Sequence, residues 1–212
     1  MGEQHTTLRF VRRSLPHWIV ADASYFVTIR LAGTLPRAVV EAMRDEREAA
    51  GDDEQSRLDL ARKQFVRIES ILDSDAQQRM DLAAPEVAQR CMKNLQWLRE
   101  RGWHIYAATV LGNHAHVLMR NGQGSSAMLL EDLDNYKGFT GREANKLLGK
   151  KGRFWARDQF DHWIRKGEKF DGVIRYIARN PVKAGLVGTW SDWPWTIVDE
   201  ELRELVDAAD RS

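Results

Sequence analysis

Hydrophobic and polar residues follow two different periods along the chain, which predicts a mixture of strands and helices. Residues 24–31 (SYFVTIRL) are rich in β-branched and aromatic side chains, which predicts a strand. Two more strands are predicted at residues 103–110 and 114–120. The connection Leu111-Gly112-Asn113 between them contains the glycine and asparagine typical of a tight turn. A short fourth strand is predicted at residues 160–165.

Apolar residues recur at helical spacing in the segments between these strands. Pro36 predicts the start of a first helix, and a polar break at residues 50–54 separates it from a second. Another helix begins at Pro85, because proline is favoured in the first helical turn. The remaining helices are predicted at about residues 126–148 and 168–179. We expect the last one to end before Pro181, because proline disfavours a helical conformation at the residue before it.

The order of the predicted elements is β, α, β, β, α, β, α, with extra residues in the first helical connection. This order predicts an α+β fold, a ferredoxin-like βαββαβ sandwich with an additional C-terminal helix. A charged helical excursion at about residues 41–80 elaborates the first connection. A chain of 212 residues is long enough for one domain with a substantial core, so we expect a single domain over residues 1–212.

Composition restricts the chemistry of the protein. The single cysteine, Cys91, excludes a cysteine-rich zinc cluster, so a metal site must use histidine, carboxylate or amide ligands. No stretch approaches the roughly 20 apolar residues of a membrane span, and the N-terminal residues do not resemble a signal peptide. We therefore expect a cytoplasmic protein without membrane contact.

Charge is distributed unevenly, although the net charge is only +1. Residues 41–75 contain 11 acidic and 6 basic side chains, whereas residues 137–183 contain 13 basic and 5 acidic ones. The basic segment favours a polyanionic partner, and its alternative interpretation is a solvated helical surface.

Two of the six histidines, His114 and His116, stand one residue apart in a predicted strand. Residues two apart project from the same face of a strand, so the two imidazoles point in the same direction. Such a pair can bind one divalent metal ion. The alternative is an ordinary pair of half-buried, hydrogen-bonded histidines.

The predicted last helix contains Tyr176 and Asn180, which lie four residues apart and therefore share a helix face. A phenol and an amide oxygen are thus presented together. Considered alone, Tyr176 also suits the edge of the core, and Asn180 also suits a helix C-cap before proline.

These stretches carry a resemblance to a known family. The stretch GNHAHVLM resembles the histidine-hydrophobic-histidine element of HUH nucleases. Together with it, RYIARNPVKAGLV, FWARDQFDHWIR and SDWPW resemble the REP-associated tyrosine transposases, the single-tyrosine branch of that superfamily. The resemblance extends over most of the chain outside residues 45–80.

The resemblance implies that His114, His116 and Asn180 hold a divalent metal, Mg²⁺ or Mn²⁺, and that Tyr176 is the nucleophile. The implied activity is cleavage and transfer of single strands through a 5′-phosphotyrosine intermediate. The implied substrate is single-stranded or hairpin DNA from repetitive palindromic elements. Tyr136 is a rival nucleophile on the preceding predicted helix, but Thr140 rather than an amide follows it by four residues.

Contacts to DNA are expected from basic and aromatic residues in the second half of the chain. The candidates are Lys137, Arg142, Lys146, Lys150, Lys151, Arg153, Arg157, Trp193 and Trp195. Core anchoring is the alternative role for the tryptophans. We expect a monomer or homodimer, associated with the nucleoid.

Two other functions remain compatible with the sequence. One is a catalytically silent regulator that binds hairpin DNA or RNA. The other is a metal-dependent phosphodiesterase that uses water as its nucleophile. A covalent adduct between protein and DNA distinguishes the transposase-like enzyme from both.

Overall fold

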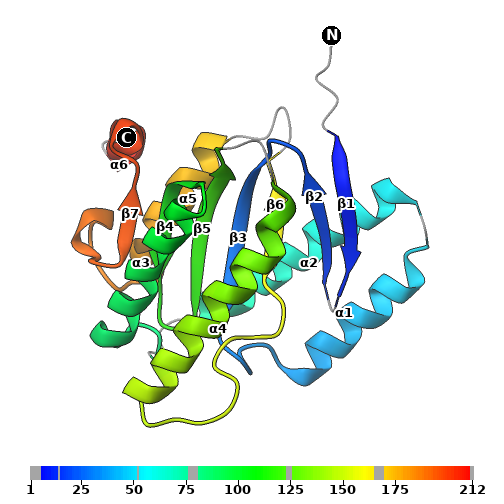
Figure 1. Ribbon diagram of the computed structural model, residues 1–212, viewed down its shortest axis with the longest axis horizontal. Helices are drawn as coiled ribbons and strands as arrows, with labels where there is room; N and C mark the ends of the chain where they lie inside the picture. The colour runs from blue at the N-terminus through cyan, green and yellow to red at the C-terminus, as the bar shows by residue number, and fades with distance from the viewer. Residues whose placement is uncertain are drawn as a thin grey trace.

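A five-stranded antiparallel sheet forms the centre of the molecule, with strand order β6-β3-β5-β4-β7 (Figure 1). The structure, a computed structural model, describes residues 6–13, 15–51, 53–75, 81–122, 126–164 and 170–210. The strands of this sheet are β3 (Ser24–Arg30), β4 (Trp103–Val110), β5 (His114–Asn121), β6 (Phe160–Trp163) and β7 (Thr196–Val198). A separate two-stranded hairpin consists of β1 (Thr7–Arg12) and β2 (Pro16–Val20).

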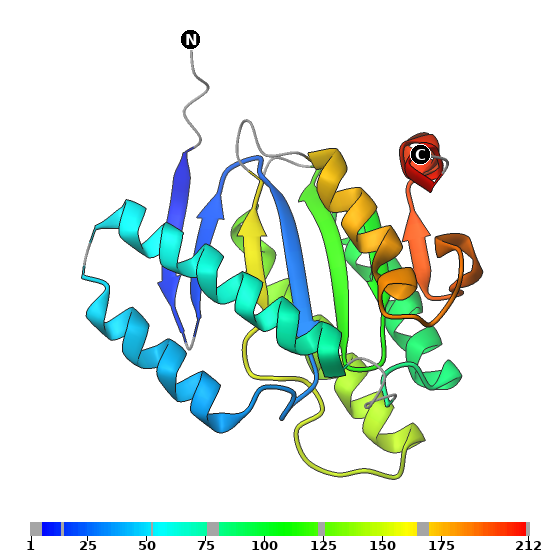
Figure 2. The same ribbon diagram turned by 180° about the vertical axis from the view of Figure 1, so that it is seen from behind.

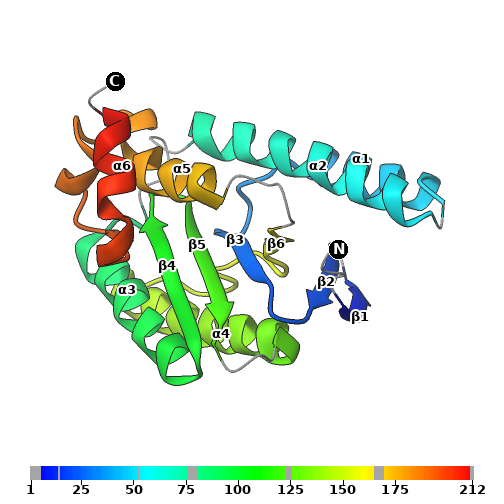
Figure 3. The same cartoon turned by 90° about the horizontal axis from the view of Figure 1, so that it is seen from above.

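Helices cover both faces of the sheet, so the molecule has three layers (Figure 3). One face packs against α3 (Pro85–Glu100) and α4 (Leu129–Leu147). The opposite face packs against α2 (Glu54–Asp75) and α5 (Phe170–Lys183), which cross in front of the sheet in Figure 2. The remaining helices are α1 (Arg37–Ala49), α6 (Arg203–Asp210) and the short η1 (Ser126–Met128), η2 (Trp190–Asp192) and η3 (Glu200–Leu202).

The predicted α+β class is confirmed, and β3, β4, β5 and β6 keep the predicted β-α-β-β-α-β order. The charged excursion corresponds to α1 and α2, which lie on the face opposite α3 and α4. Residues 76–80 of the excursion, residue 165 of the predicted strand and residues 168–169 of the predicted helix lie outside the described residues.

The structure corrects the expected end of the last helix. Pro181 lies inside α5, which continues to Lys183, so Asn180 is an interior helical residue and not a C-cap. Proline at this position lacks the N–H that would bond to the carbonyl of Ile177, and its ring crowds that carbonyl. Burial of Ile177 and Ala178 against the sheet holds the helix despite that loss.

Several elements were not predicted from the sequence, namely the β1–β2 hairpin, β7 and α6. The outer strand β1 is mostly exposed and so lacks a buried apolar face, and β7 has only three residues. Strands of these kinds give weak periodic signals, because their side chains do not need to alternate between core and solvent.

The register of the sheet decides which side chains face α2 and α5. Thr28 of β3 lies opposite His116 of β5, and Phe26 lies opposite Leu118. Directly opposed residues project from the same face, so all four point toward α2 and α5. Phe26 and Leu118 belong to a buried cluster with Ile177 and other residues of α5. The two histidines therefore lie on a face that is covered by helices.

None of the described helices has the length and apolarity needed to cross a membrane.

Candidate metal and nucleophile site

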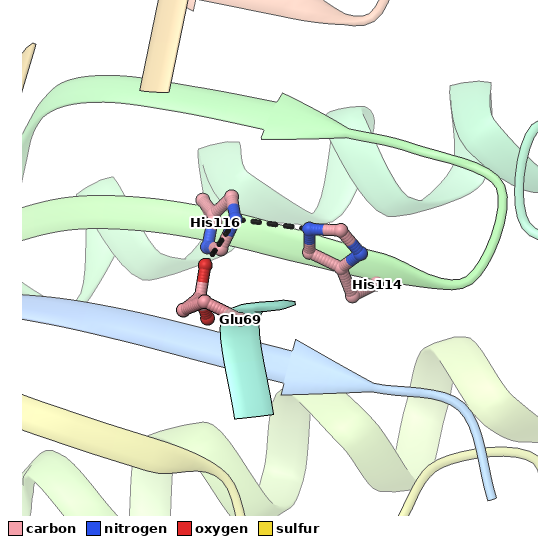
Figure 4. A group of neighbouring side chains, drawn as sticks. All are labelled: Glu69, His114 and His116. Carbon is pink, nitrogen blue, oxygen red and sulfur yellow. Dashed lines mark hydrogen bonds and ion pairs between the residues drawn. The ribbon is translucent and has the colours of Figure 1, made fainter. Parts of the chain in front are cut away.

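Three acceptor atoms from two elements converge on the helix-covered face of the sheet (Figure 4). His114 and His116 come from β5, and Glu69 comes from α2. The Nε2 atoms of the two histidines are 2.9 Å apart, and Nε2 of His116 is 3.3 Å from Oε2 of Glu69. Both histidines are 0% exposed and Glu69 is 6% exposed. The predicted histidine pair therefore has a buried carboxylate beside it.

Hydrogen bonds on the far side of each imidazole determine which nitrogen carries the proton. The Asn113 amide donates from Nδ2 to the carbonyl of Leu72, so its Oδ1 must accept from Nδ1–H of His114 at 2.6 Å. The Thr28 hydroxyl donates to Oε1 of Glu69, so it must accept from Nδ1–H of His116 at 3.0 Å. Each histidine therefore presents a bare Nε2 lone pair to the other.

This donor set fits a divalent cation. Burial lowers the pKa of His114 and of His116 to about 3, so both imidazoles are neutral near pH 7. Two imidazole lone pairs and a carboxylate oxygen then face one another, and acceptors at such short distances repel unless a cation lies between them. Nitrogen and oxygen ligands of this kind suit a divalent metal such as Mn²⁺ or Mg²⁺.

Tyr176 lies beside this cluster, as its place on α5 predicts. Its hydroxyl donates a hydrogen bond to Oε2 of Glu69, and its ring centroid is 5.5 Å from that of His116. Burial raises the pKa of the Tyr176 phenol, and the neighbouring charge of Glu69 raises it further. The phenol is thus neutral and held against a carboxylate acceptor.

Asn180 lies on the same face of α5, one turn after Tyr176. It is 1% exposed, and neither Oδ1 nor Nδ2 has a hydrogen-bond partner among the described residues. Its amide nevertheless lies close enough to the Tyr176 hydroxyl to oppose, in part, the rise in the pKa of that phenol. A buried amide without partners is costly, which is consistent with a role as a ligand to an ion.

Lys183, one further turn along α5, places a cation at the edge of the site. Its ammonium lies 2.5 Å from a carboxylate oxygen of Asp73 and 5.6 Å from the centroid of the Tyr176 ring. Its charge also contributes to the lowered pKa of His116. The Lys183 side chain is 59% exposed, so it presents a positive charge to solvent beside Tyr176.

The rival nucleophile Tyr136 lies on the opposite face of the sheet. It belongs to α4, is 1% exposed, and donates its hydroxyl hydrogen to the carbonyl of Cys91 on α3. Desolvation raises the pKa of the Tyr136 phenol well above its usual range. Tyr136 therefore acts as a core residue and does not share a site with the histidines.

Lys137 also points inward rather than toward solvent. Its ammonium donates to the carbonyl of Arg157 at 2.8 Å and to the Gln159 side chain at 2.7 Å, and it pairs with Asp134. Burial lowers the pKa of Lys137 despite these partners. These protein acceptors occupy the cation, so we do not include Lys137 among the proposed phosphate contacts.

The other basic candidates are exposed: Arg142, Lys146, Lys150, Lys151, Arg153 and Arg157. The loop that carries the last four adjoins the strand end at which His114 begins β5. Within that loop Ala156 donates its N–H to the carbonyl of Arg30, which lies opposite His114 in the sheet. Lys150 pairs with Asp81, whose neighbour Leu82 bonds to the turn before β5. The basic loop is therefore close in space to the histidine end of the sheet.

Trp193 and Trp195 are half-buried and hold the C-terminal segment against β4. The indole N–H of Trp193 donates to the carbonyl of Val110 at 2.8 Å, and Trp195 packs against the main core cluster. Trp155 is buried and donates to the hydroxyl of Thr140, as expected of a core anchor. Base stacking by Trp193 and Trp195 stays a prediction.

Comparison with solved structures finds a similar protein, whereas the comparisons of sequence find no match. No family model matches the chain, and no curated protein matches it. A solved structure of the REP-associated tyrosine transposase bound to a REP hairpin aligns with 88% of this chain and 80% of that chain. The TM-score is 0.48 and the identity 18%. The neighbour is of the kind that the sequence motifs resemble.

Glu69 is the residue of this candidate site that sequence reasoning missed. It lies in the acidic excursion, where one more carboxylate among 11 acidic residues is inconspicuous. A local signal exists, because Phe65, Ile68 and Leu72 form the apolar stripe of α2 and Glu69 occupies a position within it. A charged residue in a buried stripe requires a partner, and that partner could not be read from the sequence.

The lowered histidine pKa values predict how stability depends on pH in the metal-free protein. Above pH 6.5 the histidines are neutral in both folded and unfolded chains, so burying them costs no deprotonation and the free energy of unfolding has its full value. As the pH falls from 6.5 toward 3, the unfolded chain binds protons that the folded chain excludes, and stability is lost.

The measurement is urea unfolding at several values between pH 7.5 and pH 5 in the presence of chelator. We expect the double variant His114→Gln, His116→Gln to lose stability more slowly with acidification than the wild type. The slopes of the free energy of unfolding against pH should differ between the two proteins by up to about 1.4 kcal/mol per pH unit for each histidine. Parallel slopes for the two proteins would contradict the burial of neutral imidazoles.

Proposed function

We propose that this protein is a metal-dependent single-strand DNA endonuclease and strand transferase that uses Tyr176 as its nucleophile. The observation that supports this most directly is the hydrogen bond from the Tyr176 hydroxyl to Glu69, within a cluster of converging acceptor atoms. A phenol held beside a cation site is suited to attack on a phosphodiester. The sequence motifs around His114 and Tyr176 support the same assignment.

In this proposal His114, His116 and Glu69 hold a divalent ion, and Asn180 supplies a further oxygen ligand. The ion would neutralise a non-bridging phosphate oxygen and orient the phosphate for attack. Thr28 and Asn113 keep both imidazoles in the tautomer that leaves Nε2 free.

Chemistry at the phosphate would begin with the Tyr176 oxygen. As this oxygen forms its bond to phosphorus, the phenol proton passes to Oε2 of Glu69, which already accepts its hydrogen bond. The bond from phosphorus to the 3′ oxygen breaks, and that oxygen leaves as a hydroxyl after taking a proton from solvent. The 5′ phosphate stays on Tyr176. Attack by a 3′-hydroxyl on this linkage would rejoin the strands without another energy source.

The substrate proposed is single-stranded or hairpin DNA. The exposed cations of the loop after α4 lie near the histidine end of the sheet, and Lys183 lies beside Tyr176. Such cations bind the phosphate backbone without reading its sequence. His114 and His116 are fully buried and Tyr176 is partly buried, which favours an unpaired strand over the wider duplex as the substrate.

The first prediction for this function concerns the nucleophile. Tyr176→Phe removes one hydroxyl oxygen, so we expect it to abolish the covalent protein–DNA adduct while hairpin binding is retained. Incubation with Mn²⁺ and a labelled hairpin oligonucleotide, followed by denaturing electrophoresis and peptide mapping, measures the adduct. Oligonucleotides from palindromes that flank the gene are the appropriate substrates.

Tyr136→Phe is the matched control, because it removes the same atom from a tyrosine on the other face of the sheet. We expect this variant to form the adduct, with lower thermal stability because the Cys91 carbonyl loses its hydrogen bond. An adduct mapped to Tyr136 would reverse the assignment. Cleavage with no adduct on any residue would support the water-using phosphodiesterase instead.

A second prediction tests Glu69 as both ligand and proton acceptor. Glu69→Gln keeps an oxygen that can accept a hydrogen bond but removes the negative charge, so Mn²⁺ binding by calorimetry should weaken on the order of tenfold or more. Adduct formation should fall further than metal binding, because the amide does not take the phenol proton. Asp59→Asn, an exposed change on the same helix, should leave both quantities unaltered. Wild-type metal affinity in Glu69→Gln would remove Glu69 from the site.

A third prediction tests the basic loop. If its cations neutralise phosphates, hairpin affinity should fall steeply with salt, with a log–log slope of several units. The variant Lys150→Gln, Lys151→Gln, Arg153→Gln should reduce that slope by about one unit for each phosphate that is no longer neutralised. The measurement is fluorescence anisotropy over a range of salt concentrations. An unchanged slope would show that the loop is only a solvated surface.

A further inference from the structure

A cavity bordered by Tyr176 lies between the central sheet, the β1–β2 hairpin and two helices. It has a volume of about 460 Å³, within the range of ligand pockets. Its walls come from α2, the β2 strand of the hairpin, β3, β6 and α5. The aromatic side chains that line it are Trp18, Phe26, Phe65, Phe160, Trp163 and Tyr176.

The polar residues in this wall are largely engaged by other parts of the protein. Asp161 forms a buried hydrogen bond with Nδ1 of His17 of β2, which fastens the hairpin to β6. Gln64 accepts from Arg47 and donates to the carbonyl of Met43 and to Glu46. Apart from these groups, Arg62 and His162, the wall consists of aromatic rings and aliphatic carbon, so an occupant must be able to pack against aromatic faces.

The position of Tyr176 indicates which class of ligand the cavity binds. This residue borders the cavity and also donates its hydroxyl to Glu69 in the metal and nucleophile site. Phe26 likewise lines the cavity and lies 5.2 Å, between ring centroids, from His116. A ligand in the cavity therefore lies against the residue that is proposed to attack phosphate. In a DNA strand, the groups adjacent to a phosphate are a sugar and its base.

We propose that this cavity binds one unstacked nucleobase, from a nucleotide next to the phosphate that Tyr176 attacks. The inference rests on the proposed nuclease function and adds a base-binding pocket to it. A base has apolar faces that stack on aromatic rings, and its phosphate would stay on the polar side with the histidines. Arg62, which lines the cavity on α2, adds a cation suited to the adjoining backbone. The pocket would hold the strand so that the phosphate meets Tyr176.

This assignment gives the charged excursion a role in the substrate site. Leu58, Ala61 and Phe65 of α2 line one wall of the cavity, and Glu69 of the same helix enters the neighbouring site. One helix thus contacts both the base pocket and the nucleophile.

The first test uses unmodified protein and altered DNA. Abasic nucleotides are placed one at a time on each side of the cleaved phosphate in a hairpin oligonucleotide, and the rate of adduct formation is measured with Mn²⁺. Loss of stacking should slow the reaction on the order of tenfold or more at one of these positions. Equal rates with every neighbouring base removed would overturn the pocket while leaving the nuclease in place.

The second test does not require chemistry. Tyr176→Phe is mixed, in Mg²⁺, with hairpin oligonucleotides that carry 2-aminopurine at each unpaired position, and quenching by acrylamide is measured. One position should be protected by about threefold or more, as expected for a base stacked inside a cavity. Protection at that position without any adduct in the wild type would support the pocket and overturn only the nuclease.

Paired variants on α2 link the protection to the cavity. When Ala61→Trp is added to the Tyr176→Phe protein, the new indole fills the cavity from its wall, so the protection should disappear. Lys63→Trp puts the same side chain on the exposed side of the helix, so the protection should remain. Protection that survives Ala61→Trp, or uniform quenching at all positions in the parent protein, would overturn the proposal.

Discussion

The buried Glu69 carboxylate is the constraint on which the rest of the site depends. A charged group taken out of water is costly unless it is hydrogen-bonded and paired. Here Thr28 and Tyr176 donate to its two oxygens, and a cation shared with the imidazoles would complete the pairing. The same requirement explains why the phenol, the carboxylate and the histidines lie together although they come from different elements.

One turn of α2 connects the excursion to the central sheet at three points. Glu69 contacts β3, β5 and α5, the carbonyl of Leu72 accepts from Asn113 just before β5, and Asp73 pairs with Lys183 of α5. Because Asn113 also fixes the tautomer of His114, the position of α2 and the orientation of the His114 imidazole are coupled. A disturbance of the excursion would therefore reach the site directly.

Sequence patterns predicted the parts of the fold that depend on local spacing. His114 and His116 share a strand face, Tyr176 and Asn180 share a helix face, and the order of the central elements followed from periodicity. Glu69 could not be predicted in the same way, because it meets Thr28 across 41 residues and Tyr176 across 107. Lys137 illustrates the same limit, since nothing local shows that its ammonium turns inward to protein acceptors.

Burial also explains why the proposed nucleophile stays neutral while no ion is bound. Desolvation and the charge of Glu69 raise the pKa of Tyr176, so the metal-free site holds a neutral phenol. Burial raises the pKa of Glu69 as well, which suits its carboxylate to accept the phenol proton. Under the proposed function, a cation held by the neutral histidines would favour the anionic phenol and so oppose the effect of burial on Tyr176. The buried cluster would then couple ion binding to the start of the chemistry.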